Sequence, residues 1–284
     1  MNNDLVLTLS CVDRPGIVAA VAGFLADRGF TIRDSQQFGD DDTGLFFLRI
    51  HAASEDPISV ATIREEFAAA VAHPLEAEWA IQDPSHRQRA LVMVSKQGHC
   101  LNDLLHRSRT GSLPAEIVAV VSNHEDFREL VEWHGIEFHH VPVTGETKEQ
   151  AEDELRKLIA AHDADLVVLA RYMQILSDTL CRELAGRAIN IHHSLLPSFK
   201  GARPYYQAHA RGVKVIGATA HYVTAELDEG PIIEQDFTRV DHSSSAVDLT
   251  ATGRDLEALA LARAVTAHAE YRVLLNGSRT VVFR

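Results

Sequence analysis

The sequence predicts an α/β protein built from two domains. Three observations lead to this prediction. The chain has 284 residues, which exceeds one ordinary small domain. Its apolar fraction of 46% is sufficient for packed cores. The predicted order of strands and helices before a polar stretch near residue 85 differs from the order after it. We therefore expect one domain over residues 1–83 and a second over residues 84–284.

The first domain is expected to follow the order strand, helix, strand, strand, helix, strand. Its first helix has Asp13 near the cap and Pro15 at an early position, and Gly29 ends it. An acidic run over residues 39–44, with glycine at both ends, predicts a hairpin turn. This order is the ferredoxin-like βαββαβ pattern. The expected strands are residues 5–12, 31–38, 44–51 and 75–81, and the expected helices are residues 15–28 and 58–71.

The second domain follows a linker predicted at residues 82–89, which is polar, contains proline and lacks periodicity. Short runs rich in Val and Leu then alternate with helical stretches. Such runs are typical of parallel strands buried on both faces, so a Rossmann-like domain with a mostly parallel sheet is expected. The expected strands are residues 90–94, 117–121, 166–170, 188–192 and 216–223, and the expected helices are residues 101–107, 126–134 and 148–162.

The composition narrows the possible partners and location. The formal net charge is −13 and no dense Lys/Arg cluster occurs, so no nucleic-acid partner is expected. No apolar run approaches the ~20 residues that span a bilayer, so no membrane association is expected. The first residues carry no basic region or cleavage site, and three separated cysteines suit a reducing compartment. We therefore predict a cytoplasmic protein.

Sixteen histidines include two adjacent pairs, at residues 139–140 and 192–193. Neighbouring residues on a strand point to opposite faces, so one such pair cannot chelate a metal as a unit. No Cys-x-x-Cys or His-Glu-x-x-His spacing occurs either. We predict no metal site, and we expect His193 to pack or hydrogen-bond on the strand face opposite His192.

Polar residues lie at the end of the expected strand 188–192. Asn190 and His192 are two residues apart, so on a strand they share a face. Ligands of parallel sheets bind beyond the carboxyl ends of the strands, and an amide beside an imidazole suits a carbonyl oxygen that gains negative charge. On spacing alone, a polar pair that caps a strand fits better. Asp228 lies in a later acidic turn, and such turns are usually exposed to solvent. A catalytic role would require this turn to fold back so that Asp228 lies next to His192.

Three separated segments resemble folate-dependent formyltransferases. They read NIHHSLLPSF at residues 190–199, GATAHYV at residues 217–223 and LDEGPII at residues 227–233. Because they occur in the family's order within residues 90–240, the resemblance is specific. It implies a catalytic trio of Asn190, His192 and Asp228. Asn190 would hold the formyl oxygen, His192 would donate to the oxyanion, and Asp228 would orient water and act as the base.

The same resemblance implies a folate site. Residues 170–176 resemble the segment that holds the pterin, and residues 223–227 resemble the loop that covers its other side. Lys200 and Arg203 are candidates for the folate glutamate tail, with a solvated surface role as the alternative. The expected folate-binding residues are Met173, Gln174, Ile175, Leu176, Val223, Thr224 and Leu227.

The start of the first helix, DRPGIV at residues 13–18, is similar to ACT domains, which often bind amino acids. Thr31 stands where such domains often carry asparagine. An amino-acid effector at the helix start is one reading, and an assembly domain that builds a homo-oligomer, a dimer or tetramer, is the other. The candidate effector residues are Asp13, Arg14, Gly16 and Ile17.

An ACT domain joined to a formyltransferase-type domain is the layout of formyltetrahydrofolate deformylases. The resemblance implies hydrolysis of 10-formyltetrahydrofolate to formate and tetrahydrofolate without a cofactor, which supplies formate for purine synthesis and balances one-carbon pools. Transformylases hold a substrate phosphate on a Gly/Ser-rich loop, whereas residues 95–100 here contain one glycine. Two alternatives remain: a transferase to an amine acceptor, similar to glycinamide ribonucleotide transformylase, and a catalytically silent amino-acid or folate sensor.

Overall fold

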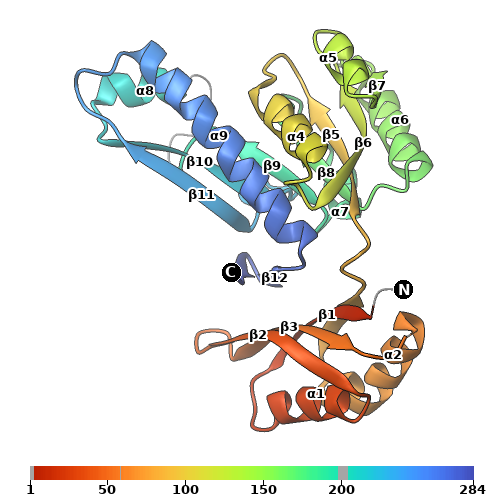
Figure 1. Cartoon of the computed structure of the whole chain (residues 1–284). Helices are drawn as coiled ribbons and strands as arrows, with labels where there is room; N and C mark the ends of the chain where they lie inside the picture. Colours follow the sequence, from red (N-terminus) through yellow and green to blue (C-terminus); the bar gives the residue numbers. More distant parts are fainter. Residues whose placement is uncertain (1–2, 58, 198–203) are drawn as a thin grey trace. The chain divides into compact units, whose positions relative to one another are not determined.

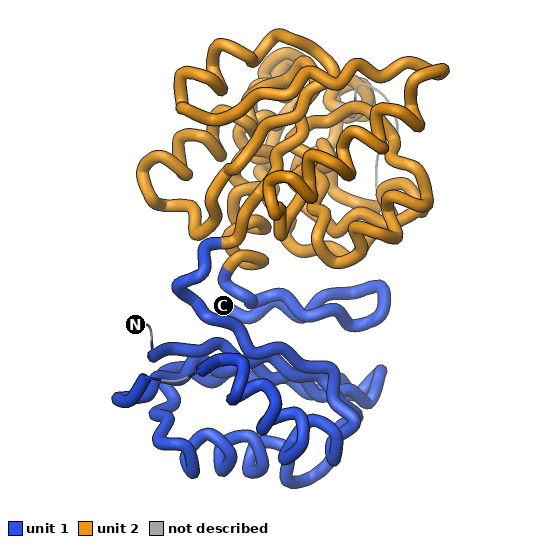
Figure 2. The backbone as a smooth tube through the Cα atoms, turned by 90° about the vertical axis from the view of Figure 1, so that its right-hand side faces the viewer, with its two compact units in different colours: residues 1–87, 270–284 blue, residues 88–269 orange. Residues whose placement is uncertain are grey.

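The computed structural model describes residues 3–57, 59–197 and 204–284. The chain forms two compact units, drawn in different colours in Figure 2: Met1–Arg87 with Glu270–Arg284, and Gln88–Ala269. The predicted division after residue 83 differs from these units at two points. The linker belongs to the first unit as far as Arg87, and the last residues of the sequence join the first unit instead of the second.

The first unit contains a four-stranded antiparallel sheet in the order β2-β3-β1-β4. Helices α1 and α2 lie on one face of this sheet (Figure 1). Alternate side chains of β1 (Leu5, Leu7 and Leu9) are fully buried in the core that the sheet forms with these helices. The ferredoxin-like prediction is therefore confirmed for this unit. Its elements are β1 (Asp4–Val12), α1 (Ile17–Ala26), β2 (Phe30–Asp40), β3 (Leu45–Ser54), α2 (Val60–Phe67), the π-helical segment η1 (Ala68–Ala72), α3 (His73–Leu75) and β4 (Glu78–Gln82).

The second helical region differs from the prediction at both ends. The expected first residue, 58, lies outside the described residues; α2 begins at Val60, where the Ser59 hydroxyl accepts a hydrogen bond from the Thr62 backbone N–H. At the other end the helical turns continue through η1 and α3, which contains Pro74. The fourth strand, β4, therefore begins at Glu78 and not at residue 75.

A C-terminal hairpin, β12 (Val273–Asn276) and β13 (Arg279–Val282), completes the first unit. The buried Asp40 carboxylate accepts hydrogen bonds from Asn276 Nδ2 at 2.6 Å and Arg279 Nη2 at 3.0 Å. The Arg49 guanidinium, on β3, donates to the backbone carbonyls of Glu270 and Tyr271. Because buried polar groups need such partners, these contacts fix the hairpin against the first sheet.

The second unit contains a seven-stranded sheet in the order β11-β10-β9-β8-β5-β6-β7. Strands β9 to β7 in this order are parallel, and β10 and β11 form an antiparallel edge pair (Figure 1). The mostly parallel sheet confirms the predicted fold class. The elements are β5 (Gln88–Val94), α4 (His99–Thr110), β6 (Ala115–Ser122), α5 (Arg128–Trp133), β7 (Glu137–His140), α6 (Lys148–Ala161), β8 (Leu166–Leu169), α7 (Asp178–Glu183), β9 (Ala188–His192), α8 (Pro204–Arg211), β10 (Val215–Tyr222), β11 (Ile232–Arg239) and α9 (Ala246–Ala269).

Helices cover both faces of this sheet, which explains the continuous apolar runs of its strands. Leu155 and Leu158 of α6 and Leu180 of α7 pack on one face against Leu91 and Met93 of β5. Helices α4 and α9 pack against each other on the other face. The carboxyl ends of β5, β8 and β9 meet at one edge, where a ligand site is expected. Within the described residues, no helix is both long enough and apolar enough to cross a bilayer.

Candidate active site

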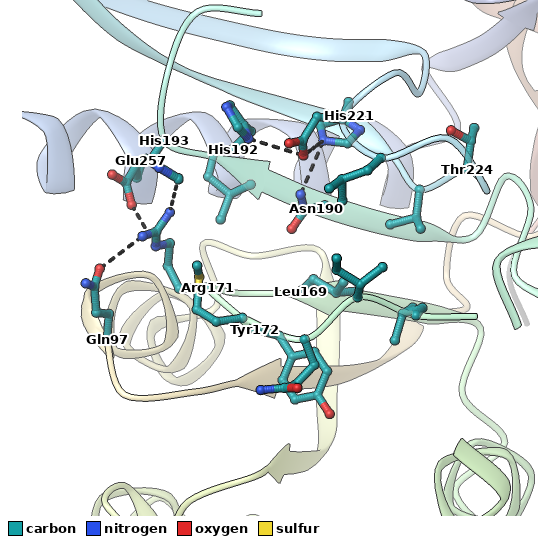
Figure 3. Close-up of a pocket in the computed structure, with 18 of the residues that line it drawn as sticks. Gln97, Leu169, Arg171, Tyr172, Asn190, His192, His193, His221, Thr224 and Glu257 are labelled. Atoms are coloured by element: carbon teal, nitrogen blue, oxygen red, sulfur yellow. Dashed lines mark hydrogen bonds and ion pairs between the residues drawn. The ribbon is translucent and has the colours of Figure 1, made fainter. Parts of the chain in front are cut away.

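A cavity of about 610 Å³ lies beyond the carboxyl ends of β8 and β9 (Figure 3). The strand ends supply its base, and the segment after β10 supplies another wall. It brings together all of the catalytic and folate-binding residues predicted from the sequence: Asn190, His192, Asp228, Met173, Gln174, Ile175, Leu176, Val223, Thr224 and Leu227. Lys200 and Arg203 lie outside the described residues.

The turn after β10 folds back and places Asp228 next to His192. Asp228 Oδ1 lies 3.2 Å from His192 Nδ1, and both side chains are largely buried. The hydrogen bond from His192 lowers the pKa of Asp228, against the opposing effect of burial, so the carboxylate is ionised at neutral pH. The buried Nε2 of His192 has no hydrogen-bond partner among the described residues. A buried polar atom without a partner costs about 1–3 kcal/mol, so this nitrogen is available for a ligand.

His221 orients the Asn190 amide. Strand β10 pairs His221 with Asn190 across the sheet, and His221 Nδ1 lies 2.9 Å from the Tyr222 carbonyl oxygen. Because that oxygen only accepts, Nδ1 carries the ring proton, and Nε2 accepts a hydrogen bond from Asn190 Nδ2 at 3.2 Å. Burial lowers the pKa of His221, which keeps the ring neutral. One amide N–H of Asn190 is thus used, and the second remains for a ligand.

The sequence contained His221 in the GATAHYV segment, but no role could be assigned to it. The informative signal is the antiparallel register of β9 and β10, which sets His221 opposite Asn190. This register joins residues 31 positions apart, so single-sequence periodicity does not show it.

The position of the turn that carries Asp228 is set by two residues with unusual backbone requirements, Asp228 and Gly230. Asp228 has φ 58, in the left-handed region that aspartate tolerates better than most residues. Two residues later, Gly230 packs directly on β10: an added Cβ would lie 1.7 Å from the Tyr222 carbonyl oxygen. Only glycine permits this approach, and the approach sets the position of the turn.

A second polar cluster lies beside the trio and centres on Arg171, which follows β8. This buried residue has φ 64. Its Nη1 lies 2.7 Å from His193 Nδ1, its Nη2 donates to Gln97 Oε1 at 3.2 Å, and its Nε lies 3.3 Å from Glu257 Oε2 (Figure 3). Arg171 therefore joins the ends of β5, β8 and β9 to helix α9.

Glu257 is almost fully buried. Burial raises the pKa of this carboxyl group, but the hydrogen bond with His99 at 2.8 Å and the charge of Arg171 outweigh burial and lower the pKa overall. The Tyr205 hydroxyl donates to the other carboxylate oxygen at 2.7 Å. The cluster is therefore a buried ion pair with hydrogen bonds to both carboxylate oxygens.

The His192 and His193 rings are stacked, with centroids 4.9 Å apart. The expectation that they lie on opposite strand faces is wrong, because β9 ends at His192 and its alternation does not extend to His193. His193 does pack and hydrogen-bond, as expected.

Comparison with known proteins identifies the family. The formyl transferase family model matches residues 88–265, and the ACT domain model matches residues 5–70. A formyltetrahydrofolate deformylase of Corynebacterium sp. is 53% identical, over 98% of each chain, and one of Bacillus subtilis is 46% identical, over 98% of this chain and 93% of the relative. The crystal structure of the Burkholderia mallei formyltetrahydrofolate deformylase is 51% identical and superposes with a TM-score of 0.95, over 99% of this chain and 100% of that one.

The chain belongs to the formyltetrahydrofolate deformylase family. The resemblance read from the sequence is thereby confirmed.

A glycinamide ribonucleotide transformylase from Symbiobacterium toebii is more distant than these deformylases, at 30% identity and a TM-score of 0.67 over 72% of this chain and 97% of that one. In this deformylase family member, the loop after β5 makes internal contacts. A Cβ at Gly98 would lie 2.4 Å from the Phe127 ring, so Gly98 accommodates packing and does not leave open backbone. Gln97, next to it, binds Arg171.

The four candidate effector residues lie together between β1 and α1 in the first unit. The Asp13 N–H donates to the Gly44 carbonyl, and the Arg14 guanidinium donates to the Pro74 carbonyl. Gly16 caps α1 with φ 97. The Ile17 side chain is buried in the core, which leaves only its backbone to meet a ligand.

Proposed function

We propose that this chain hydrolyses 10-formyltetrahydrofolate to formate and tetrahydrofolate with water as the nucleophile. The observation that carries the proposal is the ionised Asp228 carboxylate 3.2 Å from His192, beside Asn190 in one cavity. The names of the full-length relatives agree with this reaction.

Each member of the trio has a distinct role in this proposal. The free N–H of Asn190 holds the formyl oxygen. His192, with Nδ1–H directed at Asp228, presents Nε2; when protonated, this atom donates to the oxyanion as the tetrahedral intermediate forms. Asp228 Oδ1 faces His192, so Oδ2 orients the attacking water and accepts its proton, which then passes to N10 of the leaving tetrahydrofolate.

The folate would bind against exposed apolar side chains. Met173, Ile175 and Leu227 line the cavity although 58%, 62% and 58% of their respective surfaces are exposed. A flat pterin ring that covers them removes apolar surface from water, which contributes about 25 cal/mol per Å² buried. The volume of about 610 Å³ falls within the usual range for such ligands.

The loop after β5 favours water over a phosphorylated amine. A phosphate site needs open backbone N–H groups and positive charge. Here the Phe127 ring covers Gly98, and Gln97 is engaged by Arg171. The nearby guanidinium is balanced by Glu257, which would also repel a phosphate.

The first unit is proposed to sense an amino acid within a homo-oligomer. Backbone N–H groups at the start of α1, next to Gly16, suit a carboxylate, since the helix dipole favours negative charge there. A cytoplasmic location is proposed from the three cysteines, which are all free and buried.

Asp228→Asn tests the mechanism. The amide keeps the shape of the side chain but cannot accept a proton, so formate release should fall by about 100- to 10,000-fold. Binding of a non-hydrolysable folate analogue, measured by calorimetry, should change little. Glu229→Gln is the matched control, because it removes one negative charge from the adjacent exposed position and should keep normal turnover.

The reaction itself is tested with the unmodified chain and 10-formyltetrahydrofolate, with and without an amine acceptor. Formate release without acceptor supports the hydrolase. Turnover that requires the acceptor would show a transferase, and near-normal turnover of Asp228→Asn would reject the base assigned here.

A further inference from the structure

Two histidine rings converge on a carboxylate at the edge of the parallel sheet. Glu137 and His139 are two residues apart on β7 and share a face, and His162 follows the last turn of α6. The Nε2 atoms of His139 and His162 are 3.1 Å apart. Glu137 Oε1 lies 3.5 Å from His139 Nε2, and Oε2 lies 3.7 Å from His162 Nε2.

These separations are those of atoms that share one tetrahedral metal ion. Zinc binds imidazole nitrogen and carboxylate oxygen at about 2.0–2.2 Å, which puts two ligand atoms of a tetrahedral site about 3.3–3.6 Å apart. The three observed distances, 3.1, 3.5 and 3.7 Å, bracket this value. The two carboxylate distances involve different oxygens, so the Glu137 side chain must turn to bring one oxygen close to both nitrogens. One ligand atom from each of the three residues already lies within 4.8 Å of the others, so an ion between them requires only this adjustment of the side chains.

The surroundings hold both rings in place. His139 pairs with Val121 in the sheet, and Arg89 Nε donates to the His162 carbonyl at 2.9 Å. The ring exposures are only 19% and 17%. The carboxyl end of α6 adds its negative partial charge.

We propose that Glu137, His139 and His162 bind one zinc ion, with water as the fourth ligand. Two imidazoles and one carboxylate are a donor set that suits zinc. Glu137 begins β7 and His162 precedes β8, whereas the proposed active site lies beyond the carboxyl ends of the strands. The ion would therefore join the edge strand to helix α6 and play no part in the hydrolysis.

Zinc titration of the full chain after treatment with a chelator tests the site. Calorimetry should show that His139→Gln and His162→Gln each bind one equivalent fewer than the unmodified chain. His140→Gln is the matched control: it changes the adjacent histidine, whose Nδ1 pairs with Glu125 at 2.8 Å, and should keep the full stoichiometry. Zinc that binds at His192 and Asp228 would persist in all of these variants and cancel in the comparison.

Two further measurements distinguish loss of the zinc site from misfolding of the histidine variants. Glu137 is 64% exposed, so Glu137→Gln should fold normally, and because it removes a direct ligand it should weaken zinc binding at least about ten-fold. Zinc at a hundred times its Kd should raise the Tm of the unmodified chain by about 5–10 °C, and raise that of His139→Gln much less. Equal stoichiometry and Kd in all of the chains would overturn the proposal and leave a hydrogen-bonded histidine pair only.

Discussion

Glu257→Gln tests whether the Arg171 cluster stabilises the second unit through its charge. The substitution keeps the size of the side chain and an oxygen for the Tyr205 hydroxyl, but it removes the charge that faces Arg171 at 3.3 Å. At this distance and an effective dielectric constant of about 20, the attraction between the charges is about 5 kcal/mol. Breaking a buried pair usually costs about 3–5 kcal/mol, because a charge remains buried without its partner. We therefore expect the free energy of unfolding of Glu257→Gln to be lower than that of the unmodified chain by about 3–5 kcal/mol.

Urea unfolding of the full chain, followed by circular dichroism, measures the loss. The matched control is Glu154→Gln on α6, where an exposed carboxylate pairs with Lys157 at 3.2 Å; the expected cost is below about 1 kcal/mol. In the double variant Arg171→Met/Glu257→Gln the two losses should be less than additive, since no unpaired charge remains. A loss below about 1 kcal/mol for Glu257→Gln, or strict additivity with Arg171→Met, would refute the reasoning.

Two other predictions concern the turn after β10 and a buried histidine. Gly230→Ala should lower kcat/KM at least about 100-fold in the formate assay while the chain still folds, because the added carbon displaces the turn that carries Asp228. Gly145→Ala, which has open space around the added Cβ, should have the same kcat/KM as the unmodified chain. Burial lowers the pKa of His268 to about 4, so the unfolded chain binds more protons between that value and about 6.5. The free energy of unfolding should therefore fall by up to about 3 kcal/mol as the pH drops through this window. Urea unfolding of His268→Gln should show a flatter dependence of this free energy on pH. The same pH dependence in both chains would contradict the lowered pKa of His268.

Features encoded in local pattern could be predicted from the sequence. The alternation of β1 and the apolar runs of the parallel strands gave the fold class, and Asn190 and His192 share a face because a strand repeats every two residues. Asp228 required the family resemblance, since its return depends on a left-handed turn and on contact between Gly230 and β10.

Features that depend on long-range pairing could not be read in this way. Arg171 and Glu257 meet only after α9 has packed, and His221 faces Asn190 only after β9 and β10 have paired. The contact between Asp40 and Asn276 joins residues 236 positions apart, so no window of sequence reveals the final hairpin's partner. In each case a buried polar group finds its hydrogen-bond or ion-pair partner far away in the sequence, and local propensity does not determine such a partner.

The hairpin β12–β13 has a consequence for how the first unit forms during synthesis. A ribosome releases Met1–Arg87 early, but Asp40 and Arg49 then wait for partners at residues 270–279, which emerge after the whole of Gln88–Ala269. The nascent first unit therefore lacks these hydrogen bonds until residues 270–279 have been made. A stop codon after residue 269 would leave the cavity of the second unit complete and the first unit without strands β12 and β13.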